Sequence, residues 1–346
     1  MAKTTGAAAV AERPADALWL AALPTPRIAR TTDRLPVPAV PRAVPAEGAL
    51  SGLPGAVTDM AVSADGRFLV AAQYGADAVS VIDCETLTVR STIDVEEPHA
   101  VAAAERVYVN SAAVSEDHLV AIDPLIGLAL GAKEITEGTR GLVLSPAGDI
   151  AYVAVNTDAG AEIAVIDVES GRLRVIPVRP AATVDTLRIN ADGTTVYAAL
   201  TTAAGAALAV IDARGRRVSR IIELPGSVGD IAVHRDGRRV FATGWDGELG
   251  GMLTVVDVTH GRVVESIAMG DLPTGVVLTG SRAYVVVGEQ IIVLSLATAT
   301  IVDRIELGRP VSCIAVSRDE SRLYIADFGG RILARAIADT RLRAAS

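Results

Sequence analysis

The chain has 346 residues, of which 50% are hydrophobic, and its formal net charge at pH 7 is −9. This acidic balance argues against a nucleic-acid-binding surface, which needs clustered Lys and Arg. No apolar run approaches the roughly 18–20 residues that a membrane-spanning helix requires, so no transmembrane segment is expected.

The first fifty residues differ from the rest of the chain, because Ala and Pro dominate them and no repeat is visible. The apolar stretch Ala17–Leu23 is similar to the core of an export signal, but Glu12 and Asp16 lie just upstream of it and only Lys3 provides a basic start. We therefore expect residues 1–25 to be disordered or loosely docked and the protein to be cytoplasmic. A cleaved signal and an exported or envelope protein is the alternative.

The rest of the chain repeats a short β-rich run of Val, Ile and Leu that ends in Asp. These Asp residues lie at positions 83, 123, 167, 212 and 257, so that successive ones are 40, 44, 45 and 45 residues apart. A sixth copy, Ile291–Ser295, has lost its Asp. A period of this length is typical of four-stranded propeller blades, which bury their apolar faces by packing against one another.

Each repeat reads as an inner strand, a turn, a second strand, a loop, a third strand and an outer strand. Seven inner strands are predicted, which begin near Thr58, His99, Arg140, Asp185, Gly229, Thr274 and Ser312. Most second strands carry an aromatic residue that we expect to pack between neighbouring sheets: Tyr108, Tyr152, Tyr197, Phe241, Tyr284 and Tyr324. The Asp residues that end the third strands are expected to cap local turns through side-chain to backbone hydrogen bonds.

The last repeat contains three strands and no room for a fourth before Ser346. An open ring would leave an unpaired strand edge, so the missing outer strand must come from upstream of Val57. Prolines at 36, 38, 41 and 45 exclude a helix there and suit an extended segment. We therefore divide the chain into residues 1–25, a Pro-rich closing segment 26–56, a seven-bladed propeller 57–340 and a C-terminal tail 341–346.

The repeat resembles that of the YVTN family of bacterial seven-bladed propellers over residues 57–337. The segments that carry the resemblance are Ser145–Asn156, with its turn and Tyr-Val strand, and Ala161–Gly171, with its Val-Ile-Asp strand. The resemblance is weaker in the second and sixth repeats, which lack the Asp-Gly turn. It implies an all-β propeller fold and a broad binding role, and it leaves the activity open.

Cys84 and Cys313 are the two cysteines of the chain. The repeat places Cys84 in an outer-strand turn and Cys313 in an inner strand, so a disulfide between them is not expected. Cys84 is expected to be the more reactive of the two. Two unpaired thiols fit a reducing compartment slightly better than a secreted one.

The best candidate ligand site comes from aligning the inner strands at their beginnings. This alignment brings charged or titratable side chains to the top face of the ring, which we define as the end of the channel where the inner strands begin. The residues are Asp59, His99, Arg140, Asp185 and Asp230. Channel positions in propellers also often hold only polar groups and water, which is the structural alternative.

Two further residues are candidates for ligand contact on the top face. His118 begins a third strand after a long loop, and Trp245 lies on the Gly-rich loop Gly244–Gly251. Trp245 could equally cover a neighbouring blade. No His or Cys pair has metal-ligand spacing, and no Gly-x-Ser-x-Gly motif or phosphate-binding loop occurs, so neither a metal nor a cofactor is predicted.

The sequence thus favours a monomeric, non-catalytic binding or scaffolding propeller whose partner is a protein or a small molecule at the top face. The alternative is a hydrolase of the lactonase type that acts at the channel mouth. In that alternative His99 would be the base and Arg140 would stabilise an anion.

Overall fold

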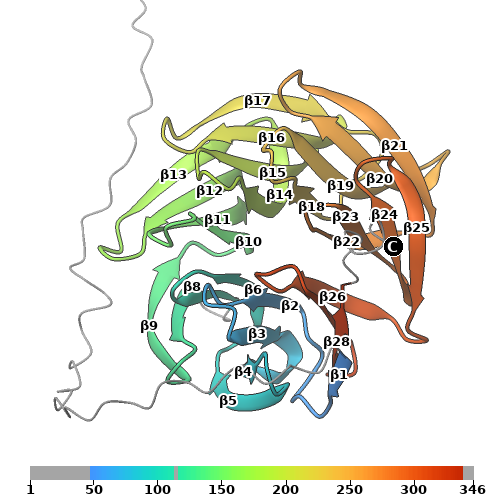
Figure 1. Ribbon diagram of the computed structural model, residues 1–346. Coiled ribbons are helices and arrows are strands. Elements are labelled where there is room, and N and C mark those ends of the chain that lie inside the picture. The colour runs from blue at the N-terminus through green and yellow to red at the C-terminus, as the bar shows by residue number, and fades with distance from the viewer. Residues whose placement is uncertain (1–46, 113–115, 338–346) are drawn as a thin grey trace, which may run out of the picture.

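The structure is a computed structural model that describes residues 47–112 and 116–337. In this part of the chain the strands form seven four-stranded antiparallel sheets, arranged as blades around a ring (Figure 1). The predicted fold class, an all-β seven-bladed propeller, is therefore confirmed. None of the described helical segments is long and apolar enough to span a membrane.

The strand bounds of the first four blades are as follows, from the inner strand outward. Blade 1 has β2 (Asp59–Val62), β3 (Phe68–Gln73), β4 (Ala78–Asp83) and β5 (Thr88–Asp94), with a short 3-10 helix η1 (Tyr74–Ala76) after β3. Blade 2 has β6 (Pro98–Ala103), β7 (Val107–Ala112), β8 (Asp117–Asp123) and β9 (Leu128–Ile135). Blade 3 has β10 (Thr139–Leu144), β11 (Ile150–Thr157), β12 (Gly160–Asp167) and β13 (Leu173–Val178). Blade 4 has β14 (Ala181–Ile189), β15 (Thr195–Thr202), β16 (Gly205–Asp212) and β17 (Arg217–Glu223).

The remaining three blades follow the same plan. Blade 5 has β18 (Ile231–Val233), β19 (Arg239–Asp246), β20 (Gly250–Asp257) and β21 (Arg262–Gly270). Blade 6 has β22 (Pro273–Leu278), β23 (Arg282–Val287), β24 (Gln290–Ser295) and β25 (Thr300–Glu306). Blade 7 has β26 (Val311–Val316), β27 (Arg322–Asp327), β28 (Ile332–Ala336) and, as its outer strand, β1 (Glu47–Leu50).

The strand β1 closes the ring, as the unpaired last repeat predicted. It pairs antiparallel with β28, with Glu47 opposite Arg335 and Leu50 opposite Ile332. Blade 7 is therefore built from both ends of the described chain, and its outer edge is covered. The prolines at 36, 38, 41 and 45 and the expectations for residues 1–25 lie outside the described residues.

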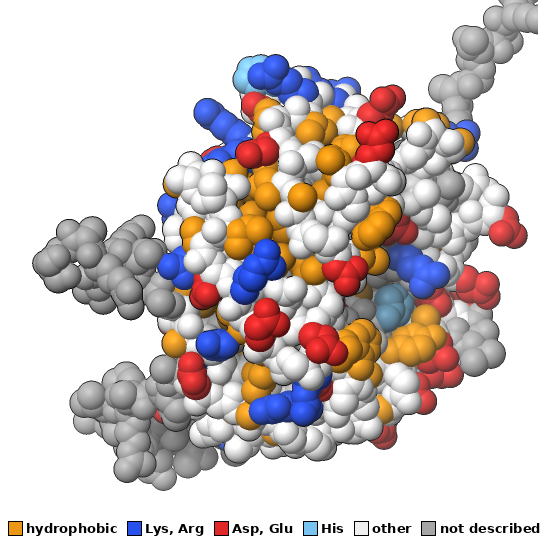
Figure 2. Space-filling view, turned by 90° about the vertical axis from the view of Figure 1, so that its right-hand side faces the viewer, with side chains coloured by type: hydrophobic (Ala, Val, Ile, Leu, Met, Phe, Trp, Pro, Cys, Tyr) orange, Lys and Arg blue, Asp and Glu red, His pale blue; other side chains and the backbone are white. Residues whose placement is uncertain are grey.

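The second and third strands of each blade are buried on both faces, because neighbouring blades cover them. All six residues of β3, for example, are buried, and five of the six in β4. This double burial accounts for the high hydrophobic content of the chain. The outer strands expose most of their residues, and on the side of the molecule that carries β21 and β25 hydrophobic side chains lie among charged ones (Figure 2).

The aromatic residues of the second strands are all at most 5% exposed, so the prediction that they are core residues is confirmed. Strand register puts each one opposite an equivalent position of the inner strand, as Tyr108 is opposite Ala102 and Tyr197 is opposite Arg188. The Tyr197 hydroxyl also donates a hydrogen bond of 3.0 Å to the carbonyl oxygen of Gly237 in blade 5. Tyr197 therefore connects blades 4 and 5 as well as filling the core.

The Asp residues that end the third strands cap turns, as predicted. Asp83 Oδ1 accepts hydrogen bonds of 2.9 Å from the backbone N–H groups of Glu85 and Thr86, and Asp257 does the same for Thr259 and His260. The cap fixes the turn between the third and outer strands without any contact between one Asp and the next.

Cys84 and Cys313 are free thiols, as expected, but the expectation that Cys84 is the accessible one is wrong. Cys84 is only 5% exposed, because blade 7 packs over its turn and Arg322 donates a hydrogen bond of 2.7 Å to its carbonyl oxygen. Burial raises the pKa of the Cys84 thiol to about 11 and also raises that of Cys313. A turn that looks exposed within one blade is thus covered by the next.

Candidate functional site in the central channel

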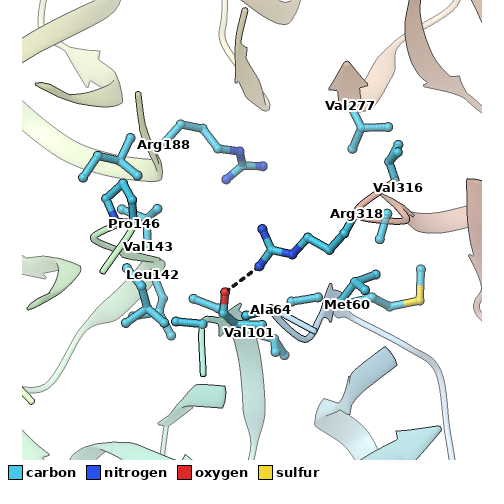
Figure 3. A pocket seen from close by; sticks show the side chains of 18 of the residues that line it. Met60, Ala64, Val101, Leu142, Val143, Pro146, Arg188, Val277, Val316 and Arg318 are labelled. Atoms are coloured by element: carbon cyan, nitrogen blue, oxygen red, sulfur yellow. Dashed lines mark hydrogen bonds between the residues drawn. The ribbon is translucent and has the colours of Figure 1, made fainter. Parts of the chain in front are cut away.

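A cavity of about 920 Å³ occupies the central channel. Its lining starts at Asp59, near the beginning of an inner strand, and continues to the first turns, which include Pro146 and Glu320. Figure 3 shows part of this lining, with Pro146 on one side and Arg318 on the other. The cavity therefore reaches the bottom face, where first and second strands are joined. We call this space the channel chamber.

The wall of the channel chamber is formed largely by small apolar side chains. These side chains occupy the inner-strand position that pairs with the aromatic residue of the second strand. In blade 1 the second strand has Val70 at that place instead of an aromatic residue. At this inner-strand position the seven blades carry Ala61, Ala102, Val143, Arg188, Ala232, Val277 and Ala315. Arg188 is thus the single charged residue in a ring of Ala and Val.

Arg188 reaches from blade 4 toward blade 5. Its Nη2 donates to Asp230 Oδ1 at 2.7 Å, and its Nη1 donates to Thr186 Oγ1 at 3.0 Å and to the Leu187 carbonyl oxygen at 2.9 Å. The Arg188 side chain is 37% exposed and that of Asp230 is 18% exposed, so this ion pair is partly shielded from solvent. The guanidinium is held in place while it points into the channel chamber (Figure 3).

Asp59 and Asp230 make the same set of hydrogen bonds at equivalent positions of blades 1 and 5. One carboxylate oxygen accepts from the next residue of its own strand, and the other accepts from the backbone N–H of the following blade. For Asp59 that donor is Val101, at 2.8 Å, and for Asp230 it is Val276, at 3.0 Å. These carboxylates therefore tie adjacent blades together at the channel.

Burial raises the pKa of Asp59 from 3.8 to about 6, although the hydrogen bond from Val101 and the positive charge of Arg188 both favour the ionised form. The negative charge of Asp230 adds a smaller upward contribution. The mutual influence of these charges places Asp59, Arg188 and Asp230 in one electrostatic group.

Arg318 is the second cation that points into the channel chamber (Figure 3). It lies in the first turn of blade 7, and its guanidinium donates to the carbonyl oxygens of Ser63, at 3.3 Å, and Ala103, at 3.0 Å. Two backbone carbonyls from blades 1 and 2 thus hold it across the bottom of the channel. None of the ion pairs within 4.0 Å in the described chain includes Arg318.

The five residues predicted to meet at the top face are separated in the structure into three places. Asp59 and Asp230 belong to the channel group with Arg188. His99 and Arg140 form a second group, since burial and, to a smaller extent, the positive charge of Arg140 lower the pKa of His99. Asp185 accepts hydrogen bonds of 3.1 Å from Thr183 and Thr201 of its own blade.

A bulge lies in the inner strands of blades 2, 3, 4, 6 and 7. His99, Arg140 and Asp185 each lie where the pairing of the inner strand with the second strand shifts by a residue. Thr274 and Ser312 lie at the same place in blades 6 and 7. An extra residue in a strand re-aims its side chain, so alignment along the sequence does not determine where these side chains point.

His99 is partly buried near the top face. Its Nδ1 lies 3.4 Å from the Glu97 carbonyl oxygen, and its Nε2 is buried and has no hydrogen-bond partner in the described residues. Burial lowers the pKa of His99, so the neutral imidazole predominates at neutral pH. Asp117, whose Oδ2 binds the backbone N–H and the hydroxyl of Thr139 at 2.7 Å each, acts in the opposite direction.

The remaining two candidates stand apart from the channel. His118 lies in β8, the third strand of blade 2, opposite Ser111 and Glu134. Trp245 lies in β19 and not on a loop as expected; it is 44% exposed, and its ring lies against the start of β20, where a Cβ atom on Gly250 would be 3.8 Å from Trp245 Cη2. Among the described residues no group of three or more His, Cys, Asp or Glu side chains could hold a metal ion.

One curated relative decides the family. The seven-bladed beta-propeller protein Rv1057 of Mycobacterium tuberculosis is 30% identical over 327 residues, which covers 83% of each chain. This chain belongs to the seven-bladed β-propeller family of that protein. No family model matches the chain.

Among solved structures, a chain of Kuenenia stuttgartiensis hydrazine synthase is similar to this seven-bladed propeller with a TM-score of 0.73. The identity is 20%, and the match covers 84% of this chain and 97% of the other. At this identity the likeness shows the fold alone.

Sequence reasoning missed both arginines of the channel chamber in this propeller. Arg188 could have been found as the one charged residue in a column that is otherwise Ala and Val. Arg318 had a weaker signal, because the equivalent turns also carry the charged residues Glu105 and Arg235. The chemistry available in the chamber is charge pairing and hydrogen bonding by two fixed guanidinium groups beside an apolar wall.

Proposed function

We propose that this protein is a non-catalytic binding propeller and that its channel chamber is the ligand site. The single observation that supports this is the cavity of about 920 Å³, a size that suits a small organic ligand. Its lining combines small apolar side chains with polar and charged groups that can orient a ligand.

The hydrogen bonds of the channel carboxylates favour binding over catalysis. Each oxygen of Asp59 accepts from a backbone N–H, and those of Asp230 accept from backbone N–H groups and from Arg188. A general base must be able to reach the proton that it removes. Carboxylates that hold two blades together are poorly suited to that task.

The test is a ligand screen with a variant that fills the channel chamber. We would record thermal shifts of the full-length protein with small acids, sugar lactones and metal ions, and follow hits by calorimetry. Val143→Phe places a ring in the chamber and should abolish binding of every chamber ligand. Val302→Phe, on an outer strand where Val302 is 52% exposed, is the control and should bind as the wild type does.

The same screen can contradict the proposal. If Val143→Phe binds all hits as tightly as the wild type, the ligand site is elsewhere on the molecule. If the wild type turns over a hit during calorimetry, the protein is an enzyme.

A lactonase-type hydrolase is the second candidate, and the observation that favours it is the buried Nε2 of His99, for which the described residues provide no hydrogen bond of good geometry. A neutral imidazole can accept a proton from water. Arg140, with an exposed side chain nearby, would stabilise the anion. Lactone hydrolysis that is lost in His99→Gln and Arg140→Gln, with both variants folded, would support this candidate. Hydrolysis that neither change affects would exclude it.

We also infer that the repeats are of the YVTN type. The support is the succession of the Gly-containing turn Ser145–Gly148, the Tyr-Val second strand and the Val-Ile-Asp third strand in blade 3, where Tyr152 and Val165 are directly paired. This inference concerns the repeat and adds no activity to the proposal.

A further inference from the structure

Two guanidinium groups enter the channel chamber from different directions. Arg188 extends from the wall in blade 4 and Arg318 from the bottom turn of blade 7, and both point into the same open space (Figure 3). Their contacts differ in one respect that matters for a ligand. Arg188 pairs with the carboxylate of Asp230, whereas Arg318 is held by backbone carbonyl oxygens only.

The two carbonyl contacts orient Arg318 without neutralising it. Its Nε and one Nη use one donor each, and a guanidinium has five N–H donors in a fixed fork. The remaining donors are available to a ligand in the chamber. A positively charged group that is already positioned binds a carboxylate with less loss of side-chain freedom than a mobile one.

The carboxylates around the chamber compete little for this cation. Asp59 accepts two backbone hydrogen bonds, and Glu320 accepts one of 2.7 Å from the backbone N–H of Gly280. Arg235 also lies over Gly280, since a Cβ atom there would be 2.7 Å from Arg235 Nη1 and 3.4 Å from the Glu320 carboxylate. Glu105, in the first turn of blade 2, is exposed to solvent at the rim.

The wall opposite these charges is apolar. Ala61, Ala102, Val143, Val277 and Ala315 line the chamber beside the two arginines. Covering these side chains with hydrocarbon removes apolar surface from water, which stabilises the bound state. Positive charge beside apolar side chains suits a ligand that has a negatively charged group at one end and hydrocarbon at the other.

We propose that the channel chamber binds a small organic carboxylate with a hydrocarbon body, with its carboxylate on Arg318 and Arg188 and its body against the Ala and Val wall. This inference rests on the proposed function and adds the chemical class of the ligand. Arg318 is the principal contact, because it makes no ion pair with a carboxylate of the described residues. Arg188 provides a second, weaker contact.

The test uses four probes that separate the charge from the hydrocarbon body. Hexanoate carries both, hexylamine carries the opposite charge on the same body, hexanol carries no charge, and acetate lacks the body. Calorimetry and thermal shift on the full-length wild type should show saturable binding of hexanoate, with hexylamine and hexanol at least tenfold weaker. Acetate should also bind at least tenfold more weakly than hexanoate.

Arg318→Gln keeps hydrogen-bonding capacity, removes the charge, and changes an exposed side chain, so the variant should fold. It should weaken hexanoate binding at least tenfold and leave hexanol binding unchanged. Arg235→Gln is the matched control, because Arg235 occupies the equivalent first turn of blade 5 and does not line the chamber. It should bind hexanoate as the wild type does.

Several results would overturn the inference. One is hexylamine or hexanol binding as tightly as hexanoate in the wild type but not in Val143→Phe. The chamber would then be a ligand site, as the proposed function states, but not for carboxylates. Equal losses in Arg318→Gln and Arg235→Gln would attribute the effect to net charge alone. Absence of any hexanoate binding would reject the carboxylate class, while the wider screen would still test the binding function.

Discussion

Single residues tie the blades of this propeller together at the channel. Asp59 connects blades 1 and 2, and Asp230 connects blades 5 and 6 through the same pair of contacts and also receives Arg188 from blade 4. Asn156 repeats the device with an amide, since its Oδ1 accepts from the Val184 N–H at 2.8 Å and its Nδ2 donates to the Val184 carbonyl oxygen at 3.1 Å. These polar side chains near the channel thus hold one blade against the next through hydrogen bonds.

The raised pKa of Asp59 makes stability depend on pH in a defined window. The carboxyl binds its proton more tightly when folded, at a pKa of about 6, than in the unfolded chain, at 3.8. The stabilisation that the protonated Asp59 carboxyl gives to the folded state is therefore fully present below pH 3.8 and is lost as the pH rises through 6. A shift of this size corresponds to about 3 kcal/mol.

Asp59→Asn removes this titration, so we expect the difference in unfolding free energy between wild type and variant to shrink by up to about 3 kcal/mol between pH 4 and pH 7. Denaturant unfolding at several pH values measures it, and the comparison cancels the other carboxyl groups. A difference that stays constant over this range would show that Asp59 titrates normally.

The thiols give a second residue-scale prediction. Burial raises the pKa of Cys84 to about 11 and raises that of Cys313, so little thiolate exists at pH 7 in the folded protein. Both should react slowly with a thiol reagent, and both should react at once in denaturant. Mass spectrometry of the non-reduced protein should find no linked peptide, and a Cys84–Cys313 peptide would contradict the blade arrangement.

Among the elements, β1 is the strand that completes blade 7 and closes the ring. Its four residues cover the outer edge of β28, which would otherwise present unpaired N–H and C=O groups. Deletion of residues 1–50 should therefore lower the melting temperature sharply or cause aggregation. Deletion of residues 1–20 leaves β1 intact and is the control, with little change expected. A protein without residues 1–50 that is as stable as the full chain would refute the closing role of β1.

At the scale of the whole molecule, closure makes the blades depend on one another. An open array of repeats has only nearest-neighbour contacts and can lose its end repeats first. Here blade 7 contacts blade 1 through Arg318 and Arg322 and contains β1 from the other end of the chain. Neither end blade is free to unfold alone.

Scanning calorimetry of the full chain should therefore give one transition, with calorimetric and van't Hoff enthalpies in agreement. Two resolved transitions would show that part of the ring unfolds independently. The same scan on the protein without residues 1–50 should broaden or split the transition.

The repeat pattern alone determined the number of blades, the core aromatic column, the turn-capping Asp residues and the need for a closing strand. Each of these features depends on contacts within one blade or on the likeness of successive blades. Both produce a regular repeat in the sequence. Tyr108 and its equivalents could be recognised as core because every blade needs the same filling.

The tertiary structure alone decided which charged side chains meet. His99, Arg140 and Asp185 share a column at the bulges, but Asp185 accepts hydrogen bonds from Thr183 and Thr201 of its own blade, whereas Arg140 acts on His99. Arg188 and Arg318 meet in the channel chamber although 130 positions separate them, and no local pattern encodes that encounter. Cys84 is buried by a blade whose sequence lies at the other end of the chain. A period specifies what each blade repeats, whereas a site in the channel depends on the residues in which the blades differ.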